Sequence, residues 1–332
     1  MLTTPLIAEL ARRGPVDVVA APAGAAVLAN HPAIRRLFVY DKRSSDAGAR
    51  GLWRVTRAIR AHAATPHGAR DGGRVAYLAQ GSARSAMLAV LAGASQRVGF
   101  TDAPGRVMYT RRVVRRAHQH HVERLWRLAF PGDPDVEPPP GALRPRLYPG
   151  DTDIAAVDAL LAGWALGSGV FIALAPGSVW GTKRWPYYPE LARRLAPRAP
   201  MVVIGSRDDA ALAAEIAAAT PAGRVLDATG RLSLLGSAEL IRRATFLVTN
   251  DSAPQHLASA MNTRTLTLYG PTVPAFGFGP LAPGSATHEH PALSCRPCHH
   301  HGPARCPLDH WRCMRELDAE GVARVVQGWY EA

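Results

Sequence analysis

Short apolar runs alternate with amphipathic stretches along the first part of the chain. Apolar residues at helical spacing predict helices over residues 50–62 and 82–94. Runs rich in β-branched or aromatic residues predict strands at 16–21, 37–40, 74–79 and 106–110. Because strands that alternate with helices are typical of βαβ units, this half is predicted to be an α/β domain with a parallel sheet.

Residues 131–150 interrupt this alternation. They contain seven prolines, which sustain neither a helix nor a central strand. We therefore predict an N-terminal domain over 1–135 and a Pro/Gly-rich linker over 136–150.

The alternation resumes after the linker. Residues 151–166 predict a helix with Asp151 or Thr152 as its cap. Further strands are expected at 170–176, 201–206, 245–251 and 263–269, with helices between them. This predicts a second α/β domain over 151–315, followed by a C-terminal helix within 316–332 that packs back on the first domain. Two such domains leave a cleft at the carboxyl ends of their strands, where open α/β sheets bind ligands.

The segment "LAPGSVWGTKRWP" (174–186) follows a predicted strand and contains Lys183, one of two lysines in a chain with 37 arginines. Small residues after a strand allow the backbone to approach a ligand, here Pro176, Gly177 and Ser178. A lysine supplies a compact, flexible charge, whereas arginine presents a rigid fork. We interpret Lys183 as a phosphate contact; the alternative is a solvated surface lysine.

Two more motifs follow later strands. In "LVTNDSAPQHLASA" (247–260), Asp251 and Ser252 precede a predicted helix, and they are either only its caps or part of a turn that holds a diphosphate. His256 lies one turn into that helix. In "LYGPTVPAFGFGP" (268–280), a strand runs into Gly270-Pro271-Thr272 and a loop that we predict to be a lid or wall.

The net charge of +13 has two interpretations. It reflects either a composition biased toward Ala, Arg, Gly and Pro or a basic surface that meets an anionic partner. The sequence has no uninterrupted run of 18 apolar residues and no secretory signal, so we expect a cytoplasmic protein.

All four cysteines fall in one segment, at 295, 298, 306 and 313. This clustering is unlike a disulfide scaffold, which distributes its cysteines to staple a chain. Two interpretations stay open. The thiols either form an ordered reduced loop, or Cys295, Cys298, Cys306 and Cys313 are zinc ligands, since the first pair has the C-x2-C spacing of a zinc knuckle.

The three motifs carry a family resemblance. "PGSVWGTKRWPYYPELA", "TNDSAPQHLASAMNTRTLTLYGPTVP" and the late "CRPC…CP…CM" resemble the ADP-heptose:lipopolysaccharide heptosyltransferases of glycosyltransferase family 9, and more closely the second of their two types. The resemblance covers nearly all of residues 1–315. It implies a GT-B fold, in which two Rossmann-like domains with parallel sheets face each other across a cleft. The second domain of that fold holds the donor nucleotide, the first holds the acceptor, and no metal or other cofactor is required.

The resemblance also assigns residues. It implies that Lys183 binds donor phosphate and that the Gly270-Pro271-Thr272 loop closes the donor site. His256 matches the family histidine, and Gly205 is a further donor-site candidate. Asp251, Ser252 and Ala253 match the loop around the donor ribose and diphosphate, with Ala253 where the family usually has glycine. A position that needs a positive φ would make this alanine a small strain.

The front of the sequence departs from the family pattern. Family members begin with a strand and a loop ending in an Asp, the expected general base, before a helix that resembles "LTTPLIAEL". We expect this strand and Asp to be missing here, so the catalytic base is unknown; a start site assigned too late would explain the loss. Asp17 opens the next strand and lies at its wrong end. Loss of a central strand would leave two strand edges unpaired, so we expect low stability and little activity.

The resemblance implies an inverting transfer of heptose from ADP-heptose to the inner core of a lipopolysaccharide precursor. The partners would be a nucleotide sugar, a lipid-linked anionic acceptor and the anionic inner membrane face, with the enzyme cytoplasmic and peripheral to that membrane. One alternative is a family 9 transferase with another sugar or acceptor. Another is a non-catalytic or nucleic-acid-binding relative, although no RNA- or DNA-binding signature is visible.

Overall fold

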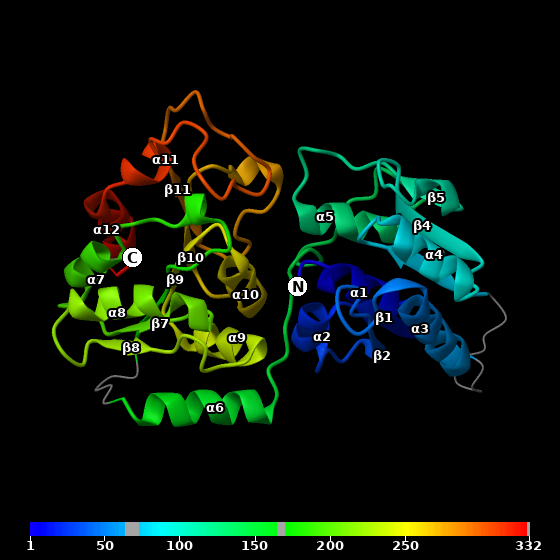
Figure 1. The fold of residues 1–332 in the computed structure, drawn as a ribbon, viewed down its shortest axis with the longest axis horizontal. Helices are drawn as coiled ribbons and strands as arrows, with labels where there is room; N and C mark the ends of the chain where they lie inside the picture. Colours follow the sequence, from blue (N-terminus) through cyan, green and yellow to red (C-terminus); the bar gives the residue numbers. More distant parts are fainter. Residues whose placement is uncertain (64–72, 165–169, 331–332) are drawn as a thin grey trace. The chain divides into compact units, whose positions relative to one another are not determined.

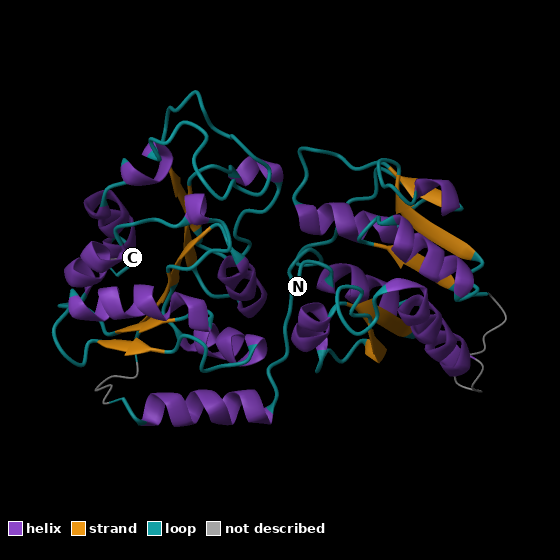
Figure 2. Ribbon diagram, viewed as in Figure 1, coloured by secondary structure: helices purple, strands orange, loops and turns teal. Residues whose placement is uncertain are grey.

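A computed structural model describes residues 1–63, 73–164 and 170–330. The chain divides into two compact units, Met1–Pro145 and Arg146–Ala332 (Figure 1). The division falls inside the Pro/Gly-rich segment, which forms loops and turns rather than helix or strand (Figure 2). Within the described ranges, no helix has both the length and the apolar character needed to cross a membrane.

In the second unit, residues 146–164 and 170–330 form one parallel sheet of six strands in the order β11-β10-β9-β6-β7-β8. Every residue of β6, β9 and β10 is buried, because these strands have neighbours on both sides and helices against both faces. The strands are β6 (Ile172–Ala175), β7 (Met201–Val203), β8 (Val225–Asp227), β9 (Leu247–Asn250), β10 (Thr265–Tyr269) and β11 (Ala286–Glu289).

Helices α7, α8 and α12 contribute to one continuous core with alternate residues of the strands, including Leu174, Val248 and Leu268. Helix α9 packs against both α6 and α10 (Figure 1). Their bounds are α6 (Asp151–Ala162), α7 (Tyr188–Leu195), α8 (Ala210–Ala218), α9 (Leu234–Arg243), α10 (Ala253–Met261), α11 (Arg312–Arg315) and α12 (Ala319–Gln327). Two 3-10 turns, η3 (Gly181–Lys183) and η4 (Arg207–Asp209), follow β6 and β7, and a third, η5 (Pro274–Phe276), follows β10.

In the first unit, the described residues 1–63 and 73–145 form five strands in two separate parallel sheets, one of β1-β2 and one of β3-β4-β5. Its strands are β1 (Val16–Ala20), β2 (Ile34–Val39), β3 (Val75–Leu78), β4 (Gln96–Phe100) and β5 (Arg111–Val113). Its helices are α1 (Thr4–Ala11), α2 (Pro22–Leu28), α3 (Gly48–Ala63), α4 (Ala83–Leu91) and α5 (His121–Trp126), with 3-10 turns at Arg106–Met108 and Arg127–Ala129.

The parallel strands and alternating helices confirm the predicted α/β class. Several local predictions are wrong. Residues 106–108 form a 3-10 turn rather than a strand; Tyr109 is extended with its ring packed over Gly99, but strand pairing begins only at Arg111. Helix α6 is capped by Gly150 rather than by Asp151 or Thr152, and the Gly150 N–H donates to Asp153. Strands β4, β8 and β11 were not predicted, because their runs are short or polar.

The C-terminal helix contributes to the core of the second unit. Helix α12 packs on α7, and Val322 and Val326 are buried in the core of the second unit. The predicted packing of this helix against the first domain stays a prediction. The segment expected before Met1 stays a prediction.

Candidate donor-binding site

Three predicted motifs meet at one edge of the second sheet. Strands β6 and β10 flank β9, so their carboxyl ends are neighbours. Residues 176–183 follow β6, residues 251–253 follow β9, and residues 270–272 follow β10. This is the position at which parallel α/β sheets bind ligands, because strand ends and helix N-termini converge there.

A buried ion pair joins the three motifs. The Lys183 ammonium lies 2.5 Å from Asp251 Oδ2, and the two side chains are only 10% and 11% exposed. The Thr272 hydroxyl donates to the same oxygen at 2.7 Å. An ammonium has three donors, so two remain for a ligand after Asp251 takes one. Lys183 is therefore not a solvated surface lysine.

The Asn250 side chain links the turn after β9 to the segment after β6 through hydrogen bonds. This fully buried side chain donates to the Pro176 carbonyl at 2.7 Å and accepts from the Trp185 N–H at 3.3 Å. The turns after β6 and β9 are thereby cross-linked, and Lys183 lies between the two bonded positions. Asn250 was not among the predicted site residues, although an amide at the end of a buried strand is a recognisable signal.

The N-terminus of α10 points its unbonded backbone N–H groups toward this edge. Ser252 occupies the cap position, but its side chain makes no capping bond, and the Asp251 carboxylate turns to Lys183 instead. Ala253 begins the helix and is not among the residues with positive φ, so alanine causes no backbone strain there. His256 lies one turn further, with its ring 6.4 Å from that of Phe278.

Gly177 and Gly205, two of the predicted donor-site glycines, lie against the side chain of Asp209. A Cβ on Gly177 or on Gly205 would overlap the Asp209 carboxylate, which is buried between the ends of β6 and β7. Asp209 accepts from the backbone and side chain of Ser206, both at 2.8 Å. These glycines therefore make room for Asp209. The Ser178 hydroxyl accepts from the Trp180 N–H at 3.3 Å and so stabilises its own turn.

Arg296 is the main residue that the sequence did not indicate. Its side chain is 6% exposed and donates to the carbonyls of Gly270, Thr272 (2.9 Å) and His290 (2.8 Å). It also pairs with Glu289 at 2.7 Å. The loop that presents Thr272 to Asp251 is thus held by an arginine from a later segment, one of 37 in the chain, which explains why sequence alone did not single it out.

Tyr269 lies beneath this loop. Burial, reinforced by the nearby charge of Asp251, raises the pKa of its hydroxyl well above the ordinary value. The hydroxyl therefore stays protonated and donates to Gln255 at 3.2 Å, or to the Phe278 carbonyl at 3.1 Å. These bonds connect β10 to α10 behind the Lys183–Asp251 pair.

The cysteine segment forms the outer wall of the site. The Cys298 N–H donates to the Pro271 carbonyl at 3.1 Å, and a Cβ on Gly302 would contact the Lys183 side chain. All four thiols are free, and burial raises the pKa of Cys313 to about 11. Among the residues that the structure describes, no three His, Cys, Asp or Glu side chains are grouped so as to hold a metal ion. The zinc interpretation therefore gains no support.

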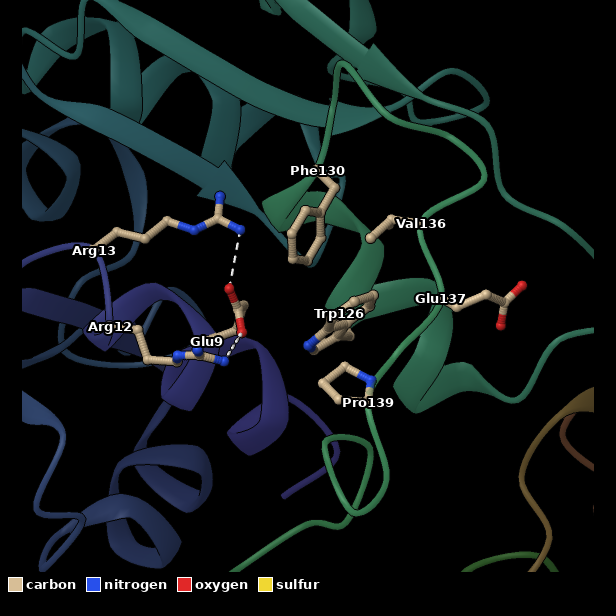
Figure 3. A pocket seen from close by; sticks show the side chains of 8 residues that line it. All are labelled: Glu9, Arg12, Arg13, Trp126, Phe130, Val136, Glu137 and Pro139. Atoms are coloured by element: carbon tan, nitrogen blue, oxygen red, sulfur yellow. Dashed lines mark hydrogen bonds and ion pairs between the residues drawn. The ribbon is translucent and has the colours of Figure 1, made fainter.

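A hollow of about 420 Å³ lies in the first unit, whereas these motifs belong to the second (Figure 3). Glu9 lies between Arg12 and Arg13 and pairs with both, at 3.4 and 3.0 Å. Trp126 and Phe130 form the opposite wall (Figure 3). None of the predicted donor residues lines this hollow, and Glu9 already pairs with both of its arginines.

Comparisons with known proteins agree with this fold. Lipopolysaccharide heptosyltransferase 1 of Pseudomonas aeruginosa is 36% identical over 132 residues, which is 39% of this chain and 36% of that protein. The chain thus spans about a third of the length of the first curated relatives it matches. A family 9 glycosyl transferase structure from Veillonella parvula superposes with a TM-score of 0.82 at 19% identity, covering 100% of this chain and 94% of that one.

The structure of E. coli ADP-heptose lps heptosyltransferase II superposes with a TM-score of 0.77 at 22% identity, covering 100% of this chain and 96% of that one. These likenesses confirm the GT-B type of fold. The sequence model described as glycosyltransferase family 9 (heptosyltransferase) matches residues 73–310, well over half of the chain. The chain therefore belongs to glycosyltransferase family 9.

Proposed function

We propose that this protein transfers a heptose from ADP-heptose to the inner core of a lipopolysaccharide precursor, with inversion at the anomeric carbon. The observation that carries the proposal is the buried Lys183–Asp251 pair, bonded to Thr272 at the carboxyl ends of three adjacent strands. A second support is membership in a family whose curated relatives are named heptosyltransferases.

The donor diphosphate fits against Lys183 and the N-terminus of α10. The two remaining ammonium donors and the free helix N–H groups would neutralise phosphate oxygens, and this stabilisation grows as the leaving group gains charge. Asp251 keeps the ammonium in place through a hydrogen bond that does not need the ligand. The pocket is therefore organised before the donor arrives.

The transfer itself is a single displacement. The acceptor hydroxyl oxygen forms a bond to the anomeric carbon while the bond from that carbon to the diphosphate oxygen breaks, and the electron pair leaves with ADP. The acceptor proton passes to a general base. We assign no residue of this chain to that role. Asp17 does not suit it, because it is engaged by Arg35 at 2.9 Å and lies near His62 at the start of β1.

Titration calorimetry with ADP-heptose tests the donor part of the proposal. Lys183→Ala is expected to weaken donor binding by about 100-fold or more, because a charge-assisted phosphate contact disappears from a buried site. Lys42→Ala is the matched control, since it removes the only other lysine, which lies in the first unit. Equal donor affinity in the wild type and Lys183→Ala would refute the assignment.

The same assay separates the main rival, a family 9 transferase for another sugar. ADP-heptose, ADP-glucose, UDP-N-acetylglucosamine and GDP-mannose would be compared. We expect the adenine nucleotides to bind and ADP-heptose to bind most tightly; preference for a uridine or guanosine sugar would favour the rival. Proton NMR of the transfer product reports the anomeric configuration, and retention would exclude the inverting mechanism.

We further propose that the protein works in the cytoplasm, peripheral to the inner membrane, where a lipid-linked acceptor would be presented. The net charge of +13 supports this placement, because an anionic leaflet attracts basic surfaces. Vesicle binding that ignores salt concentration would contradict it.

A further inference from the structure

We propose that the outer face of α3 is a docking surface for an anionic lipid bilayer. The inference rests on the proposed function, in which the acceptor is lipid-linked, and it names the element that meets the lipid. Helix α3 (Gly48–Ala63) lies in the first unit, remote in sequence from every donor-site residue. Its sequence, "GARGLWRVTRAIRAHA", contains no acidic residue.

The basic side chains of α3 share one side of the helix. Arg50, Arg54, Arg57 and Arg60 follow one another at intervals of three or four residues. At 100° per residue, these positions fall within about 120° of the helix circumference, and Trp53 falls inside the same arc. The sequence therefore places one large aromatic ring within a stripe of four arginines.

The structure turns this stripe to solvent. Trp53 is 62% exposed, and the Arg57 guanidinium lies 5.4 Å from the centre of its ring. The opposite side of α3 supplies the buried contacts, where Val55 packs with Tyr40 and Leu88. The outer face is therefore not needed to fold the first unit. Burying such an exposed tryptophan against a partner would be favourable.

Three of the four arginines in the stripe have no carboxylate partner among the described residues. Arg54 pairs with the buried Asp46 at 2.5 Å, whereas no carboxylate pairs with Arg50, Arg57 or Arg60 within the described ranges. Asp17 pairs with Arg35 and also lies 3.4 Å from His62 at the end of α3. An excess of positive charge therefore remains beside Trp53.

A hollow of about 510 Å³ adjoins this face, between β2 and α3. Basic groups of Arg36 and Arg54 meet apolar groups of Phe38 and Val39 in its lining. Val39 is 45% exposed. A mixed basic and apolar lining suits a phospholipid, whose phosphate is anionic and whose glycerol and upper acyl carbons are apolar.

The chemistry favours a bilayer over other anionic partners. Tryptophan rings prefer the headgroup level, and arginines near an anionic surface each contribute about fivefold in affinity. Single-stranded nucleic acid is bound on several aromatic rings along a groove, whereas α3 exposes one. The surface thus fits a flat anionic interface that accepts one ring.

The test uses the full chain and sedimentation with vesicles of phosphatidylcholine alone or with 30% phosphatidylglycerol. Arg50→Gln/Arg57→Gln/Arg60→Gln should lower affinity for the anionic vesicles by roughly 100-fold. The matched control removes the same charge elsewhere in the first unit. Its changes, Arg106→Gln/Arg111→Gln/Arg112→Gln, affect exposed residues outside α3 and should lower affinity less than tenfold.

Trp53→Ala should weaken binding severalfold and leave the salt dependence unchanged, because the ring contributes apolar burial rather than charge. Circular dichroism and thermal unfolding check that each variant is folded. Equal losses in both arginine variants would overturn the proposal in favour of diffuse charge, and so would an unchanged affinity of the α3 variant. Binding of polyuridylate that depends on α3, with vesicle binding unaffected, would reassign the face to nucleic acid.

The outcome is separable from the donor proposal. ADP-heptose titrations should give the same affinity for the wild type and all α3 variants, because α3 and the donor residues belong to different units. Vesicle binding that depends on α3, in a protein that ignores ADP-heptose, would sustain the docking surface and refute the proposed transfer.

Discussion

The two units follow the same βαβ plan but differ in how completely their sheets are built. In the second unit, six strands pair continuously and all residues of β6, β9 and β10 are buried. In the part of the first unit that the structure describes, five strands form two sheets, and the residues of β1 alternate between half-buried and exposed. Val19 and Val75, on β1 and β3, are 40% and 39% exposed.

This difference bears on function. A strand with neighbours on both sides has its backbone groups satisfied and its side chains fixed by packing, which suits a site whose atoms must be held in place. The candidate donor-site residues all belong to the second unit, whereas the basic α3 face belongs to the first. The lipid docking that we propose for α3 would tolerate a less rigid support, because it would depend on charge and one ring rather than on atomic placement.

The largest effect should come from Arg296→Ala. It removes a buried cation and leaves several carbonyls of the 270–290 region without donors, so the second unit should lose about 3 kcal/mol of unfolding free energy. Donor affinity should fall as well. The comparison is Arg97→Ala in the first unit, which also binds loop carbonyls, of Ala94 and Met108, but is half-buried; about 1 kcal/mol is expected there.

Urea unfolding measures both stabilities, and calorimetry with ADP-heptose measures affinity. Arg296→Lys keeps the positive charge but loses the planar guanidinium group that donates to several carbonyls. If Arg296 positions Thr272, the lysine variant should bind donor more weakly while regaining part of the stability. Full donor affinity in Arg296→Ala would show that the arginine supports only the fold.

A matched pair of valines compares the two sheets directly. Val248→Ala in β9 should cost about 2–3 kcal/mol, because a fully buried side chain leaves a cavity. Val18→Ala in the half-buried β1 should cost less than about 1 kcal/mol. Hydrogen exchange resolved by peptide assigns each loss to its unit. Equal costs would mean that the first sheet is as tightly packed as the second.

Lowering the pH should reduce the unfolding free energy of the first unit before that of the second. Burial, with the charges of Arg115, Arg124 and His120, lowers the pKa of His121 to about 4. Between pH 6.5 and 4 the unfolded state therefore binds a proton that the folded state does not, so stability falls as pH falls through this range. About 1–2 kcal/mol should be lost between pH 6.5 and 5.

His121→Gln should flatten this pH dependence in unfolding experiments, while the wild type and His121→Gln should have similar stability slopes above pH 7. An unchanged slope between pH 6.5 and 5 in the variant would assign the acid sensitivity to other groups.

The smallest expected effect is that of Lys183→Arg on donor affinity. Lys183→Arg keeps the charge, yet its bulkier fork must fit where the ammonium lies 2.5 Å from Asp251. Donor affinity should fall about tenfold, less than in Lys183→Ala. An arginine variant with wild-type affinity would show that the site requires charge alone.

Local pattern predicted most elements of this protein. The match is close for α10, the helix predicted to follow Ser252 and found at Ala253–Met261, because a proline near the helix start and regular apolar spacing mark it clearly. The donor motifs were also visible, since strands followed by small residues announce ligand-binding turns. Strands β8 and β11 escaped notice because each is short and lies at the edge of the sheet.

The sequence by itself determined the α/β alternation, the linker, the family motifs and the basic stripe of α3, since each depends on residues close together in the chain. Only the tertiary structure decided that β9 lies between β6 and β10, which brings Lys183 to Asp251 across 68 residues. It also decided that Arg296 holds the Thr272 loop and that the first sheet is split. These contacts join distant segments, and no local periodicity encodes which distant segments will pair.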